Sequence, residues 1–103
     1  MFQKGVMDNY VNLDLSKELT CLAGFLLGEK VYEYQVDGKI DIHKPFTIIF
    51  PKHIELITSS FVEGLFSKPL EIIGFEKLKE NINIKTSSEK LTQDVLDKLL
   101  NNT

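Results

Sequence analysis

The sequence predicts a small α/β domain, with a mixed or mostly parallel sheet and helices packed on it. Stretches with the two-residue period of strands alternate along the chain with stretches of helical period. The segments between successive strands are long enough for right-handed crossover connections, which favour parallel pairing. Because 103 residues suit one hydrophobic core, we expect a single domain over residues 1–103.

The first third of the chain predicts one strand and one helix. Residues 10–15 (YVNLDL) alternate apolar and polar side chains, as a half-buried strand does. Apolar residues at helical spacing over residues 19–36 predict a mostly covered helix, weakened at Gly24 and Gly28. The stretch VDGK at residues 36–39 predicts a turn after it.

The middle of the chain predicts a central strand followed by a helix. Residues 46–50 (FTIIF) form a short, continuous apolar run between two prolines, as expected for an interior strand covered on both faces. Three consecutive hydroxyl residues, Thr58, Ser59 and Ser60, then open an amphipathic segment that should end near residues 67–69. A helix is expected to begin within two residues of Ser59.

The last third predicts a helix, a strand and a second helix. Residues 70–73 fit either strand or helix, residues 75–80 favour helix, and residues 82–85 (INIK) alternate like a strand. Thr86 and Glu89 have the spacing of a capping box, which predicts the start of the final helix. Its apolar stripe consists of Leu91, Val95, Leu96, Leu99 and Leu100.

The stretch TIIFPKHIELITSSFVEGLF, residues 47–66, resembles the centre of the STAS-like family, small bacterial proteins related to the STAS domains of anti-sigma factor antagonists. Weaker similarity covers LLGEKVYE before it and the tail after it. The resemblance implies a STAS-like fold and a non-enzymatic regulatory module that docks on a partner protein, often an ATPase of the histidine-kinase type or another sigma-factor regulator. In the antagonists the partner phosphorylates the serine that begins the helix, which by position is Ser59.

The same resemblance places the partner-docking surface at Thr58, Ser59, Ser60 and Glu63. The antagonists carry acidic residues where this chain has Phe50 and Thr58, so their phosphorylation pattern is matched only in part. The hydroxyl cluster also has a purely structural interpretation, because Ser60 and Glu63 form a capping box worth about 1 kcal/mol. Phosphorylation or anion recognition at Ser59, and helix capping alone, both remain open at this point.

Other features exclude several functional classes. The net charge of −3 is spread without a basic block, which argues against nucleic acid as a partner. The longest apolar run, residues 19–27, is far shorter than the roughly 20 residues that a membrane span requires. A single cysteine, Cys21, cannot form an internal disulfide and is expected to pack in the core of a cytoplasmic protein.

We expect neither a metal nor another cofactor, and no catalytic residue. His43 and His53 lie ten residues apart, with only Asp41 and Glu55 near them, which is not the ligand spacing of a zinc site. The prediction is therefore a regulatory or protein-interaction module. The alternative is a small inhibitor from a mobile element that blocks an enzyme through an acidic α/β surface. The sequence predicts neither the partner's identity nor the oligomeric state.

Overall fold

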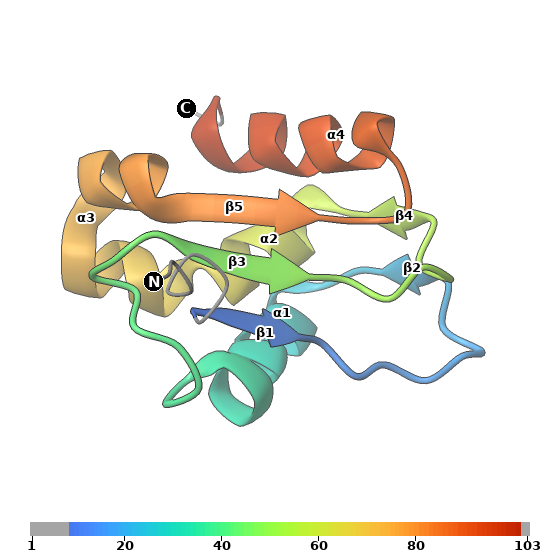
Figure 1. The fold of residues 1–103 in the computed structure, drawn as a ribbon. Helices are drawn as coiled ribbons and strands as arrows, with labels where there is room; N and C mark the ends of the chain where they lie inside the picture. The colour runs from blue at the N-terminus through green and yellow to red at the C-terminus, as the bar shows by residue number, and fades with distance from the viewer. Residues whose placement is uncertain (1–8, 102–103) are drawn as a thin grey trace, which may run out of the picture.

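The computed structural model describes residues 9–101, which form a layer of parallel strands with helices packed against it (Figure 1). The elements in chain order are β1 (Tyr10–Asn12), β2 (Cys21–Leu22), α1 (Phe25–Val31), the π-helix η2 (Tyr32–Val36), β3 (Phe46–Ile49), β4 (Leu56–Ile57), α2 (Ser59–Leu65), α3 (Ser67–Asn81), β5 (Ile82–Lys85) and α4 (Glu89–Leu100).

The main sheet has the order β1-β3-β5, and both pairings are parallel. Tyr10 pairs with Thr47, and Phe46 pairs with Ile82, so β3 is the interior strand. The predicted fold class and the central strand are confirmed. The helix after it begins at Ser59, as expected.

The two faces of the main sheet differ in burial. Phe46, Ile48 and Ile84 are buried on one face, whereas Thr47 and Ile49 on the other are only half-buried. In Figure 1, α4 lies above the main sheet, α2 behind it, α1 below β1 and α3 at its left end, and no helix of the described chain crosses its front. The prediction that residues 46–50 are covered on both faces is therefore wrong. β-Branched residues suit a strand whether or not its second face is covered, so the continuous apolar run was misleading.

Residues 19–22 were predicted to be helical and are not. Cys21–Leu22 instead form β2, which pairs in parallel with β4 through Cys21–Leu56 and Leu22–Ile57. Gly24 follows with a φ of 102°, a conformation that favours glycine, and α1 begins only at Phe25. From there the helical prediction holds, since α1 and η2 continue to Val36.

Helices α1 and α2 cross in direct backbone contact. A Cβ atom on Gly28 would overlap the carbonyl oxygen of Phe61 and lie 2.6 Å from the nitrogen of Leu65. A Cβ atom on Gly64 would overlap the carbonyl oxygen of Phe25. Both glycines are buried where the helices cross. Because neither has a side chain, the backbones of α1 and α2 can approach closely.

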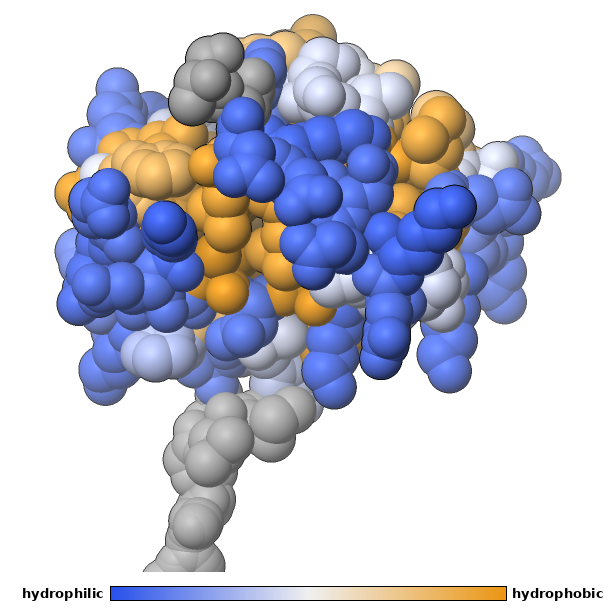
Figure 2. Space-filling model, turned by 90° about the horizontal axis from the view of Figure 1, so that it is seen from above, coloured by the Kyte–Doolittle hydropathy of each residue, from blue (hydrophilic) through white to orange (hydrophobic). Residues whose placement is uncertain are grey.

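The C-terminal third largely follows the prediction. Residues 70–73 are helical within α3, which is interrupted at Gly74, where φ is 83°. β5 occupies the predicted residues. In α4 the predicted stripe is buried at Leu91, Val95 and Leu99. Seen from above, the surface carries groups of hydrophilic residues with hydrophobic residues exposed between them (Figure 2).

The cap of α4 lies two residues later than predicted. Ser88 accepts the N–H of Leu91 at 3.1 Å, whereas the hydroxyl of Thr86 bonds to Thr92 at 2.9 Å. Several hydroxyl residues in a row offer alternative caps, and the backbone conformation decides among them. None of the helices over residues 9–101 is long and apolar enough to cross a lipid bilayer.

Candidate functional site

Thr58 caps α2. Its backbone is extended, and its Oγ1 accepts the N–H of Phe61, with 3.3 Å between the heavy atoms. Because α2 already begins at Ser59, Ser60 lies inside the first turn and cannot serve as the N-cap. The capping box predicted for Ser60 and Glu63 is therefore wrong, and Thr58 takes that role.

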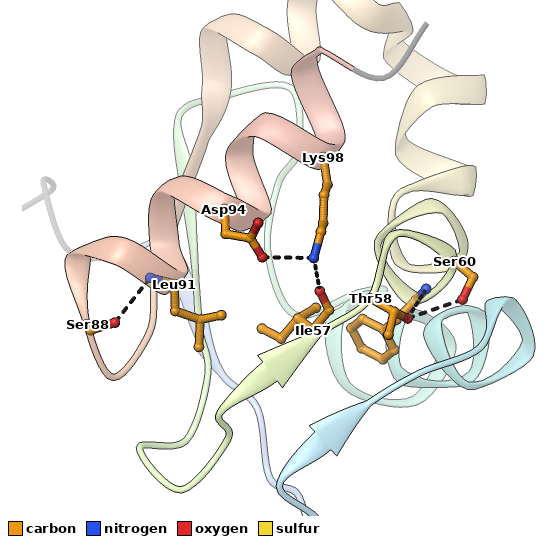
Figure 3. Close-up of polar contacts among 8 residues, drawn as sticks. Ile57, Thr58, Ser60, Ser88, Leu91, Asp94 and Lys98 are labelled. Atoms are coloured by element: carbon orange, nitrogen blue, oxygen red, sulfur yellow. Dashed lines mark hydrogen bonds and ion pairs between the residues drawn. The ribbon is translucent and has the colours of Figure 1, made fainter.

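Ser60 connects the starts of α1 and α2. Its Oγ accepts the backbone N–H of Gly24, the N-cap residue of α1, at 3.1 Å. The same oxygen shares a hydrogen bond of 3.1 Å with Thr58 Oγ1 (Figure 3). The backbone N–H of Thr58 donates to the Leu22 carbonyl. Because β2 and β4 are parallel neighbours, α1 and α2, which follow them, begin at the same end of the small sheet.

Ser59 has neither of these structural roles. It is exposed, and its hydroxyl makes no hydrogen bond with any residue from 9 to 101. Glu63 is also exposed and lies four residues further along α2, so the two residues share one side of the helix. Of the three consecutive hydroxyls, only that of Ser59 can be changed without removing a hydrogen bond within this part of the chain.

A lysine from the last helix reaches the strand that precedes the cluster. Lys98 Nζ donates to the Ile57 carbonyl at 2.7 Å and to Asp94 Oδ2 at 2.8 Å (Figure 3). Its side chain is 24% exposed. The structure shows that its ammonium group fixes α4 to the end of β4, one residue before Thr58.

The remaining candidate residues do not form a site. His53 Nε2 donates to the Ser16 carbonyl at 2.8 Å, which ties a loop down, and His43 is exposed beside Asp41. Within residues 9–101, no three His, Cys, Asp or Glu side chains are grouped so as to hold a metal ion. Cys21 lies in β2 and is half-buried, less enclosed than predicted.

The sequence of the chain matches a model of a known protein family, and the matched segment includes the hydroxyl cluster. A model described as "STAS-like domain of unknown function (DUF4325)" matches residues 28–92, more than half of the chain. The chain belongs to this STAS-like family. The match begins at Gly28 of the helix crossing and includes the hydroxyl cluster and Glu63. Neither a curated protein nor a solved structure matches the chain.

The predicted resemblance to STAS-like proteins is thereby confirmed, and the two parallel sheets and four α-helices found within residues 9–101 agree with it. The STAS-like match ends at Thr92, so Lys98 lies outside it. The role of Ser59 as a modified or partner-contacting residue remains a prediction.

Stability measurements can test which of the three hydroxyls caps α2. Thr58→Ala should lower the free energy of unfolding by about 1 kcal/mol, because the N–H of Phe61 loses its acceptor. Ser59→Ala, the matched control one residue away, should change it by less than about 0.5 kcal/mol. Urea unfolding followed by circular dichroism measures both values. An equal loss from both variants would contradict the assignment of the cap to Thr58.

Proposed function

We propose that this STAS-like domain is a non-enzymatic regulatory module that docks on a partner protein through the start of α2. The docking surface consists of Thr58, Ser59, Ser60 and Glu63, and negative charge on Ser59 changes the docking. The partner class is an ATPase or another sigma-factor regulator in the cytoplasm, as the family resemblance implies.

The observation that carries this proposal is the difference between Ser59 and its two neighbours. Thr58 and Ser60 are held in hydrogen bonds that start α2 and join it to α1. The hydroxyl of Ser59 is exposed between them and makes no hydrogen bond with the described residues. A hydroxyl that supports no part of the fold is accessible for contact with a partner or for modification.

The surroundings of Ser59 would make an added charge effective. A phosphoryl group carries a charge of about −1.5 to −2 at neutral pH, so it attracts or repels any group that a docked partner places near it. The partner's contact would also include Glu63 on the same side of α2. Because the bonds of Thr58 and Ser60 start the helix, phosphorylation of Ser59 would leave the fold in place.

A second candidate is a small inhibitor from a mobile element, favoured by the net charge of −3 and by the carboxylates along α1 and η2. An inhibitor of this kind would bind its target enzyme through the acidic surface. Its binding would not depend on Ser59.

Photo-crosslinking in the native cell tests the docking surface. A benzophenone amino acid is placed at position 59, at position 63 or, as a control, at the exposed Lys85 of β5. We expect irradiation to capture the same protein from positions 59 and 63 and not from position 85, with mass spectrometry identifying it as an ATPase or sigma-factor regulator. Identical products from all three positions would count against the proposed surface.

A further inference from the structure

A second feature of the surface lies away from the hydroxyl cluster. A hollow of about 450 Å³ opens between the helical segment α1–η2 and the start of α3. Glu29, Glu33 and Asp37 line it from the first segment, and Lys68 and Ile72 line it from α3. We call it the acidic hollow; its buried lining consists of Tyr32 and Gly64.

The carboxylates of the acidic hollow form a row. Glu29, Glu33 and Asp37 follow one another at four-residue steps and are all exposed. Glu29 of α1 and Glu33 of η2 are four residues apart, and Asp37 follows directly after η2. Their like charges oppose one another, so a cation lying against the three would relieve this repulsion. Lys68 is paired with Glu71 at 3.8 Å and therefore leaves much of the negative charge uncompensated.

The unbonded hydroxyl of Tyr32 is an independent indication that the acidic hollow binds a ligand. The residue is only 7% exposed, yet its hydroxyl has no hydrogen-bond partner among residues 9–101. No fully buried side-chain nitrogen or oxygen of these residues lacks a partner. The hydroxyl is therefore not enclosed in the core but reaches the hollow that Tyr32 lines. A buried ring that presents a free polar atom to a cavity is suited to hold a bound polar group.

The π-helix joins the backbone of Tyr32 to that of Asp37, the last residue of the carboxylate row. The N–H of Asp37 donates to the carbonyl of Tyr32 at 2.8 Å, five residues back. Burial raises the pKa of Tyr32, and the negative charge of Asp37 raises it further, so the hydroxyl stays protonated at neutral pH. Its oxygen can then accept from a bound cation while its proton is available to a carboxylate.

We propose that the acidic hollow receives an arginine side chain of a partner protein. The proposal rests on the chain acting as a protein-docking module, but not on any role of Ser59. A guanidinium group has five N–H donors in one plane and can bond to two carboxylates and the Tyr32 oxygen together. The carboxylates are spread along a wall instead of converging on one point, which suits an extended planar cation. Ile72, 55% exposed, offers apolar contact to the aliphatic stem or to a neighbouring apolar residue.

The probe for this site is a short peptide with two arginines and two leucines. The matched control peptide has citrulline, which is nearly the same shape but neutral, in place of each arginine. Titration of isotope-labelled protein, followed by NMR, should show shifts of the backbone amides of residues 29–37 and 68–72. The citrulline peptide should bind at least about tenfold more weakly, because charge-assisted hydrogen bonds are lost.

Substitutions test whether the arginine peptide binds in the acidic hollow. The double variant Glu33→Gln with Asp37→Asn should weaken the arginine peptide at least about tenfold, and Tyr32→Phe should weaken it several-fold. Glu89→Gln on α4 and Ser59→Asp should leave it unchanged, which separates this proposal from the one on α2. Melting curves confirm that each variant is folded.

Equal binding of the two peptides, unchanged affinity in the double variant, or shifts confined to another surface would overturn the proposal. Spermidine that binds the hollow more tightly than the arginine peptide would also overturn it, since the hollow would then be a site for a small cation.

Discussion

Gly64→Ala is expected to lower the free energy of unfolding by about 2–4 kcal/mol, although alanine is normally the better helix former by about 1 kcal/mol. The new methyl group would overlap the carbonyl oxygen of Phe25 and lie 2.8 Å from its carbonyl carbon. These are backbone atoms of α1, so no side chain can rotate to make room. The two helices would have to separate, which would open the core between them.

Gly28→Ala is expected to act in the same direction, because its Cβ meets the backbone of α2 at Phe61 and Leu65. Leu26→Ala is the control on the same helix, since Leu26 is 65% exposed, and it should change stability by less than about 0.5 kcal/mol. Urea unfolding curves give all three values. Stability of Gly64→Ala equal to that of the parent would show that α1 and α2 do not meet through their backbones.

The parts of the fold that the sequence predicted well carry a strong local signal. Residues 82–85 alternate strictly, and the final helix has a continuous apolar stripe, so both elements were placed correctly. The β2–β4 ladder was missed because each strand has two residues, which is too short to show a period. Leu19, Leu22 and Phe25 happen to follow helical spacing, and only the φ of Gly24 separates strand from helix there.

The start of α2 was predicted in position, but the capping residues of α2 and α4 were not. The S/T-x-x-E spacing pointed to Ser60 and Thr86, whereas the structure uses Thr58 and Ser88 as caps. Where several hydroxyls are adjacent, their order in the sequence does not reveal which one has extended backbone. The bond from Lys98 to Ile57 joins residues 41 positions apart, so no local pattern could have revealed it.

The acidic hollow was also beyond sequence reasoning. In the sequence, Glu29 and Glu33 fall in the predicted helix over residues 19–36 and Asp37 falls in the turn after it, so nothing joins the three into a site. Only the tertiary fold places Ile72 of α3 and Tyr32 of η2 on the lining of one hollow. The four-residue spacing of the acids is the one signal that could have drawn attention to them.

The second large expected effect is the loss of partner binding on Ser59→Asp. The substitution removes no hydrogen bond with the described residues, and an acidic residue in the first turn of a helix is favourable. The melting temperature should therefore stay within a few degrees of the parent value. A fixed negative charge at the proposed docking surface should nevertheless lower the partner's affinity at least about tenfold, through repulsion and the cost of desolvating the carboxylate.

Binding of the crosslinked partner to the parent protein and to Ser59→Asp, Ser59→Asn and Ser59→Ala tests the docking proposal most directly. Asparagine matches aspartate in size without its charge, so the comparison isolates the charge itself. Isothermal titration with the purified partner should give similar affinities for the parent, Ser59→Asn and Ser59→Ala, and at least about tenfold weaker binding for Ser59→Asp. Unchanged affinity of Ser59→Asp would contradict the proposed switch and leave the three hydroxyls as the start of a helix alone.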